Sequence, residues 1–130
     1  MRTHLLKDLR IAGKETILNE IPEFDFYDLR HVTGINWTDE HSTESDRTNI
    51  NVTFAAAYEH EKSRATSPVQ IRCSGVKRLK LPELGGAFWL NEIEIEDIAA
   101  DQLEDVRYRI KDFGGTSFEV LCAAIELALE

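Results

Sequence analysis

The sequence predicts a mainly β protein with about six antiparallel strands, forming a sandwich or a strongly curved sheet, and one short N-terminal helix. Several short segments alternate apolar and polar residues, which is the period expected of half-buried strands. Two of these segments carry rows of opposite charge. Pairs of glycines, which favour turns, lie between strand-like segments near the C-terminus. With 130 residues, 42% hydrophobic and 30% charged, the chain fits a single globular domain over residues 1–130.

The N-terminal segment, residues 1–21, has apolar residues at helical spacing. They fall into two groups, Leu5, Leu6 and Leu9, then Ile17, Leu18 and Ile21. We therefore expect a short N-terminal helix, weakened in its middle by Gly13, because glycine disfavours helix. Pro22 ends the helical pattern, and the antiparallel β domain is expected over residues 24–130.

The middle of the chain alternates strand-like and polar segments. Strands are expected at residues 31–37, 50–58 and 69–76, with polar loops at 38–49 and 59–67. In the first strand His31, Thr33, Ile35 and Trp37 share one parity, and Gly34 suggests a bulge. Residues 77–81 continue the alternation, but their cations predict an edge strand.

The C-terminal third contains three more strand segments. In residues 90–98, Glu92, Glu94 and Glu96 alternate with isoleucines, and in residues 106–113 cations alternate with apolar residues. If these two segments are neighbouring strands, their charged rows pair across the sheet. Residues 98–105 link them and are expected to hold at most one helical turn.

The end of the chain supports both a helix and a strand. Gly114 and Gly115 predict a hairpin into a strand at residues 118–122. Residues 123–130 are rich in helix-forming Ala, Leu and Glu, yet a bulge near Ala123 places Ile125 and Leu127 on the same face as the preceding strand. We therefore predict strand for the tail.

The charge of the chain restricts its partners. The net charge is −9 and no basic cluster stands apart, so nucleic acid is not an expected partner, because phosphate binding requires clustered cations. A basic protein is the more compatible partner. Membrane association is not expected, since the sequence has no apolar run long enough to span a bilayer.

Cys73 and Cys122 lie in apolar strand segments, so we expect buried thiols. A disulfide between them would require neighbouring strands and an oxidising compartment. The sequence begins without a secretory signal, which leads us to expect a cytoplasmic protein.

Motifs for catalysis, metals or cofactors are missing from the sequence. The four histidines lack metal-ligand spacing, no serine lies in a nucleophile elbow, and the glycine pairs do not form a phosphate loop. We therefore predict no metal and no cofactor, and an enzyme is the less favoured hypothesis. A catalytic acid and base among the 24 carboxylates would carry no motif of this kind, because folding alone decides which side chains converge.

Two sets of residues are candidates for a functional site. The first is a partner-binding surface of Glu92, Glu94, Glu96, Trp37 and Trp89. The carboxylates are expected to pair within the sheet, with an outward acidic patch as the alternative. For the tryptophans we expect core packing, with exposure at an interface as the alternative. The second set is a pocket between sheet and helix lined by Tyr27, Asp28, Arg30 and His31, for a small enzyme or ligand binder.

Two parts of the chain resemble a known group of proteins. Phe24, Phe26, Asp28 and the alternation up to Trp37 resemble the opening strand of small uncharacterised bacterial all-β proteins, some grouped with immunity proteins of toxin systems. Tyr27 stands where that group has histidine. The segments 93–98, 107–112 and 118–122 are similar to its closing strands. The resemblance implies an inhibitor that neutralises a toxin by binding it, without catalytic residues. A homo-oligomer formed through a strand edge is a third hypothesis.

Overall fold

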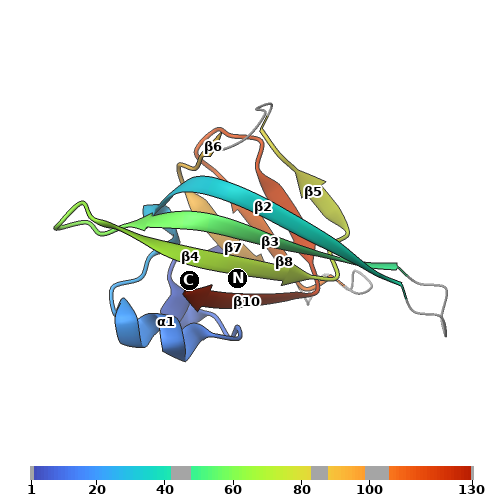
Figure 1. The fold of residues 1–130 in the computed structure, drawn as a ribbon, viewed down its shortest axis with the longest axis horizontal. Coiled ribbons are helices and arrows are strands. Elements are labelled where there is room, and N and C mark those ends of the chain that lie inside the picture. Colours follow the sequence, from blue (N-terminus) through green and yellow to red (C-terminus); the bar gives the residue numbers. More distant parts are fainter. Residues whose placement is uncertain (1, 42–47, 83–87, 99–105, 130) are drawn as a thin grey trace.

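Two antiparallel β-sheets pack face to face in the computed structural model, which describes residues 2–41, 48–82, 88–98 and 106–129 (Figure 1). The mainly β prediction is confirmed. The described part of the chain has more strands than the sequence suggested, because two-residue strands are too short to produce an alternating pattern.

One sheet has long strands and the other has short ones. The long sheet contains, in spatial order, β10 (Ala124–Leu129), β4 (Thr66–Ser74), β3 (Thr48–Glu59), β2 (Leu29–His41) and β6 (Phe88–Trp89). The short sheet contains β1 (Arg2–Thr3), β7 (Ile93–Asp97), β8 (Tyr108–Asp112), β9 (Glu119–Cys122) and β5 (Arg78–Lys80). The helical elements are η1 (Leu6–Asp8), α1 (Lys14–Glu20) and η2 (Phe26–Asp28).

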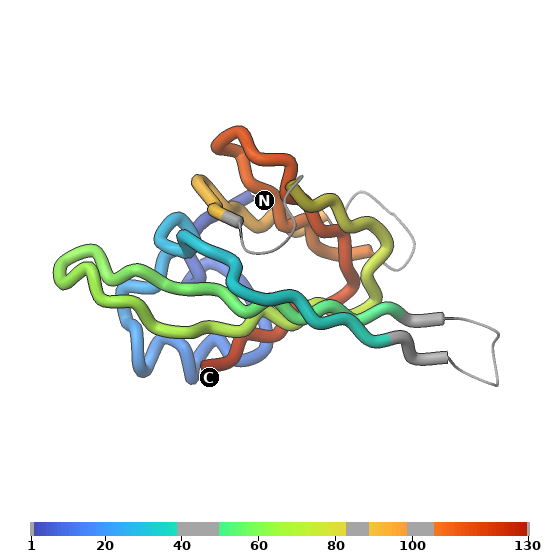
Figure 2. The backbone as a smooth tube through the Cα atoms, turned by 45° about the horizontal axis from the view of Figure 1, so that its top comes forward, coloured from blue at the N-terminus to red at the C-terminus, as the bar shows by residue number. Residues whose placement is uncertain are grey.

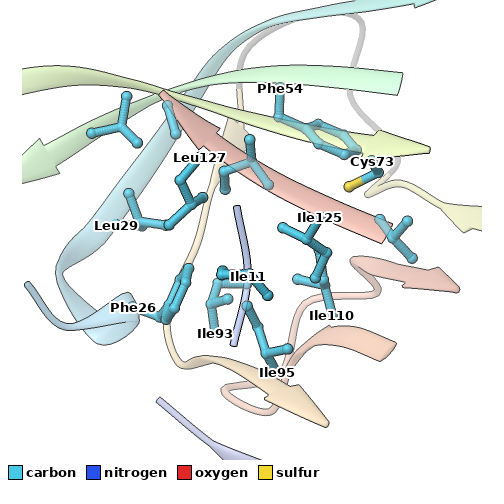
Figure 3. Close-up of a cluster of buried hydrophobic side chains, with 14 of the residues drawn as sticks. Ile11, Phe26, Leu29, Phe54, Cys73, Ile93, Ile95, Ile110, Ile125 and Leu127 are labelled. Atoms are coloured by element: carbon cyan, nitrogen blue, oxygen red, sulfur yellow. The ribbon is translucent and has the colours of Figure 1, made fainter. Parts of the chain in front are cut away.

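The hydrophobic core lies between the two sheets. Figure 3 shows side chains of both sheets pointing toward one another, among them Phe54, Cys73, Ile125 and Leu127 from the long sheet and Ile93, Ile95 and Ile110 from the short sheet. Phe54 also meets Phe118 edge to face, with ring centroids 5.3 Å apart. The alternation in the sequence thus gives each strand one buried face, as predicted.

The N-terminal segment closes one side of this core. It forms two helical elements, η1 and α1, instead of the one short helix expected, and Gly13 immediately precedes α1. Ala12 bridges to Glu126, and the Leu127 N–H donates to the Ala12 carbonyl at 2.9 Å. Gly13 has φ +83°, and a Cβ there would lie only 1.8 Å from the Leu127 carbonyl oxygen. This glycine therefore permits the close approach that covers the edge of β10.

The predicted polar loop at 38–49 is wrong at both of its ends. β2 continues to His41 and β3 begins at Thr48, with Thr38 opposite Asn51 in the register. Backbone pairing extends the hairpin through polar residues because the ladder needs no apolar side chain. Residues 42–47, and most of the predicted linker at 98–105, lie outside the described residues.

The predictions for the C-terminal half are largely confirmed. β5 lies at an edge of the short sheet, and residues 124–129 form a strand. The irregularity predicted near Ala123 does more than realign one strand, because the chain passes there from the short sheet to the long sheet. Ile125 and Leu127 are buried after this change of sheet.

The two cysteines are free, buried and adjacent. Cys73 belongs to β4 and Cys122 to β9, so they approach each other from opposite sheets. A hydrogen bond with Cys122, together with burial, raises the pKa of the Cys73 thiol well above its ordinary value. A protonated, enclosed thiol is a poor nucleophile, which identifies Cys73 as a core residue.

The charged rows of β7 and β8 pair within the short sheet. Glu96 lies opposite Arg109, with carboxylate and guanidinium 3.4 Å apart, and Asp97 is 3.6 Å from Arg107. Glu94 lies opposite Lys111 and is 3.5 Å from Arg2 of β1. The expected pairing of this row with the cations of β8 is confirmed for Glu96, whereas Glu94 forms its ion pair with β1.

Asp112 organises the turn between β8 and β9. It is only 2% exposed, and its Oδ1 accepts hydrogen bonds from the N–H groups of Glu92 (3.0 Å) and Gly114 (2.7 Å). Its Oδ2 accepts from the N–H of Asn91 (3.0 Å) and the hydroxyl of Thr116 (2.6 Å). Burial alone would raise the pKa of Asp112, but these hydrogen bonds outweigh burial and hold the pKa below its ordinary value.

Replacing Asp112 with asparagine should lower the free energy of unfolding by about 2–3 kcal/mol, because an amide cannot accept all four hydrogen bonds. The folded-state pKa is depressed, so this stabilisation is complete above the unfolded pKa and is lost as the pH falls through the folded pKa. Urea unfolding at neutral pH and near pH ~3 should show the difference between wild type and D112N shrinking in acid. A control, Asp97→Asn, weakens a partly exposed ion pair and should cost ~1 kcal/mol or less. A D112N difference that stays constant with pH would contradict this role.

Reversing the cations of β8 with R107E and R109E should destabilise the fold by roughly 1 kcal/mol or more in total, since carboxylates would then face Asp97 and Glu96. Adding Glu96→Arg to the R109E variant should restore part of the loss, because the pair is re-formed with opposite polarity. Thermal unfolding of the single and double variants measures both effects. Equal stability of all variants would show that the rows do not stabilise the sheet.

Candidate functional site

Tyr58 holds the segment that leads into β2. Its side chain is fully buried and stacks on Phe24, with ring centroids 4.7 Å apart. Its hydroxyl donates to the Glu23 carbonyl at 3.3 Å and accepts from the Asp25 N–H at 3.3 Å. Burial raises the pKa of Tyr58 to about 12, so the phenol stays protonated and serves as a structural donor. It therefore fixes the position of η2.

Tyr27, on η2, lies against the acidic side of β7. Its ring stacks on His4, with centroids 3.9 Å apart, and the His4 Nδ1 is 2.7 Å from the Asp25 carboxylate. Partial burial and the nearby carboxylates Glu94 and Glu92 raise the pKa of Tyr27. The phenol is therefore a neutral hydrogen-bond donor within a negatively charged environment.

An open depression of about 440 Å³ lies beside η2 and the start of β2. It is lined by Tyr27, Arg30, Asn91, Glu92 and Gly114. Two residues of the predicted pocket, Tyr27 and Arg30, are thus brought together. Arg30 and Glu92 give the depression one positive and one negative group, which suits it to bind polar or charged atoms.

The other two residues of the predicted pocket point to different neighbours. Asp28 lies 3.5 Å from the Tyr58 hydroxyl and 3.8 Å from the Arg30 guanidinium. Burial, with Asp25 and Glu61 nearby, raises the pKa of Asp28, while Arg30 opposes that shift. His31 stacks on Trp89, with ring centroids 4.5 Å apart, on the long sheet. Neither Asp28 nor His31 lines the depression.

The three candidate carboxylates differ in their surroundings. Glu94 and Glu96 pair with arginines inside the short sheet. Glu92 precedes β7, is exposed, and lines the depression; among the described residues it makes no ion pair. Of the acidic row, Glu92 is therefore the residue most accessible to another molecule.

The expectation that the tryptophans pack in the core is wrong. Trp37 is 66% exposed and Trp89 is 65% exposed. Trp89 occupies the two-residue strand β6, opposite His31, and Trp37 lies far along β2, opposite Val52. Trp89 therefore shares the outer face of the long sheet with His31, whereas Trp37 lies on the core-facing side with Val52.

A bulge in β2 separates His31 from Ile35 and Trp37. The register shifts between Val32 and Gly34, as Gly34 suggested, and Thr33 is the extra residue. His31 then shares a face with Trp89 and Ala57, away from the core, while Ile35 and Trp37 share a face with Phe54 and Val52. The single parity expected for these residues is thus broken at Thr33.

Ile35 is a further exposed residue, and the sequence pattern alone did not single it out. It is 39% exposed although it is paired with the buried Phe54. Its apolar neighbour Trp37, two positions on, was the available signal, because both belong to one face of the strand after the bulge.

The described residues contain no group of three or more His, Cys, Asp or Glu side chains arranged to hold a metal ion. None of the helices in the described residues has the length and apolar character required to cross a membrane.

Comparison with known proteins identifies the family. The chain matches the family of immunity protein PIM8 over residues 16–128, a span that runs from α1 into β10. No curated protein and no solved structure gives a significant match. The match confirms the resemblance to immunity proteins, and the chain belongs to the immunity protein PIM8 family.

Proposed function

We propose that this protein is a non-catalytic inhibitor that neutralises a toxin by binding to it. Membership of an immunity protein family over residues 16–128 carries the proposal. An inhibitor of this kind needs an accessible surface rather than a reactive group. The exposed Trp37 favours such a surface, since tryptophan is enriched among the residues that dominate binding energy.

The charge of the protein favours a basic toxin. The net charge is −9, and opposite charge on a partner increases the rate of encounter and suppresses wrong partners. Because Glu94 and Glu96 are engaged by Arg2 and Arg109, we propose that Glu92 is the carboxylate of this row that meets the toxin.

We propose that the inhibitor acts in the cytoplasm. The free thiols of Cys73 and Cys122 support this location, because the two side chains are in contact and a reducing compartment keeps such a pair unoxidised.

A second candidate function rests on the depression beside η2. Its lining by Tyr27, Arg30 and Glu92 suits a small polar ligand, and an enzyme acting on such a ligand would also use this site. The depression is open and shallow compared with typical ligand pockets, which is why inhibition by binding is preferred.

The purified protein should recover a basic toxin from the native host. Expression of the recovered protein in test cells should arrest growth, and coexpression of the inhibitor should restore it. The association rate should fall by about tenfold or more between low and high salt, because screening removes the electrostatic attraction. Surface plasmon resonance at several salt concentrations measures this rate.

The ratio of inhibitor to toxin separates the two candidate functions. A binding inhibitor restores growth only in proportion to the amount of toxin that it can bind. An enzyme would restore growth at a much lower ratio of this protein to toxin. Recovery of no toxic protein would contradict the inhibitor proposal, and a rate insensitive to salt would contradict the basic partner.

Replacing Glu92 with lysine should slow toxin association by about threefold to tenfold and leave thermal stability unchanged, because Glu92 is exposed. Glu20→Lys, on the exposed side of α1, makes the same change in net charge away from the depression and serves as the matched control. Equal slowing by both variants would show that only the total charge matters.

A further inference from the structure

Three of the four sheet edges among the described residues are protected against pairing with another chain. β1 is only two residues long, and β5 is three residues long and carries Arg78 and Lys80. The edge of β10 is covered by Ala12 and the segment leading to α1. Short edges, edge cations and covering segments are the usual devices that prevent strand addition.

The fourth edge, at β2, lacks these devices. β6 pairs only with His31 and Val32, and among the described residues no strand pairs with the outer edge of β2 beyond Val32. The sequence from Thr33 to His41 contains no Lys, Arg or Pro. Figure 2 shows β2 and β3 continuing beyond the rest of the two sheets as a two-stranded arm. The backbone of β2 therefore presents unpaired N–H and C=O groups along this arm.

The same part of β2 exposes its core-facing side. Ile35 and Trp37 are paired with the buried residues Phe54 and Val52, so all four side chains lie on one face of the long sheet. Yet Ile35 is 39% and Trp37 66% exposed, whereas Phe54 and Val52 are buried. An apolar patch thus adjoins an unpaired strand edge.

We propose that the edge of β2 from Thr33 to Thr38 receives a β-strand of the toxin, which pairs with the β2 backbone and covers Ile35 and Trp37. This inference rests on the proposed function and names the surface through which it acts. Strand addition supplies backbone hydrogen bonds for affinity, and alternate side chains supply specificity. The toxin strand would place apolar residues over Ile35 and Trp37, with basic residues elsewhere on its surface.

Charge complementarity favours a toxin strand over a second copy of this chain. Two copies, each with a net charge of −9, repel each other, whereas a basic protein is attracted. The absence of edge cations in β2 also favours a basic toxin strand. A lysine at this edge would repel such a strand and would block backbone pairing.

The first test places a lysine on the proposed surface. Ile35→Lys and Trp37→Lys should each weaken binding of the purified, growth-arresting protein recovered from the host by about thirtyfold or more. Both side chains are exposed, so thermal unfolding should stay close to that of the wild type. Calorimetric titration measures the affinity.

Two matched controls make this test specific. Leu81→Lys changes a residue with the same 39% exposure as Ile35, and Trp89→Lys changes a tryptophan with nearly the same exposure as Trp37. Both controls should bind within about twofold of the wild type. Toxin binding that Ile35→Lys and Trp37→Lys leave unaffected would overturn the proposed surface while leaving the inhibitor function intact. Equal weakening by Trp89→Lys would also overturn it, since the contact would not be confined to the arm.

The second test asks whether the backbone itself pairs. Amide hydrogen exchange of residues 33–38 should slow by about tenfold or more in the toxin complex, because outward N–H groups become hydrogen bonded. Unchanged exchange together with weakened variants would show side-chain docking and overturn strand pairing. Sedimentation of the protein alone should show a monomer; a dimer abolished by Trp37→Lys would assign the edge to a second copy instead.

Discussion

The shared core depends on the point at which the chain leaves one sheet for the other. Val120 and Cys122 face the core from the short sheet, and Ile125 and Leu127 face it from the long sheet, so the alternation shifts by one residue at Ala123. The Ala123 N–H donates to the Ser74 carbonyl at 2.9 Å, which ties the crossing to the end of β4. Gly75 follows with φ +62°, and a Cβ there would approach the Ala123 side chain to 3.0 Å. Two crossings between the sheets, from β4 to β5 and from β9 to β10, therefore touch at this point. One residue more or less at Ala123 would turn the apolar face of the tail outward.

Much of this arrangement is readable from the sequence, because alternation identifies both the strands and their buried faces. The opposite charges of β7 and β8 correctly predicted neighbours, and the cations of β5 correctly predicted an edge. The alternation could not show which sheet a strand joins, so the tail at residues 124–129 was predicted as a strand without its change of sheet. The short strands β1 and β6 were missed because two residues cannot display a period.

The candidate site shows a different limit of sequence reasoning. Trp37 does belong to the core-facing side of β2, as an apolar residue in a strand should. The local pattern cannot report whether another part of the chain covers this face at Trp37, and Trp37 is in fact 66% exposed. Similarly, the bulge at Thr33 reverses the faces of all later residues, so the parity that grouped His31 with Trp37 applied only up to that point. The predicted pocket residues Arg30 and His31 have different neighbours for the same reason, since Arg30 is the extra residue of another irregularity, between Leu29 and His31.

The negative charge of the protein accounts for how the exposed edge of β2 can remain open. An unpaired strand beside a large apolar side chain tends to associate with its own copies, and natural proteins usually place cations or proline there. This chain places none between Thr33 and His41, but it carries a net charge of −9, which opposes self-association over the whole surface. Net charge and edge cations both oppose strand pairing with other chains, but only net charge discriminates between partners. A lysine at the edge would exclude every strand, whereas overall negative charge excludes acidic copies and admits a basic protein. An edge kept open in this way is consistent with selective binding by an immunity protein, because the feature that prevents aggregation also selects the toxin.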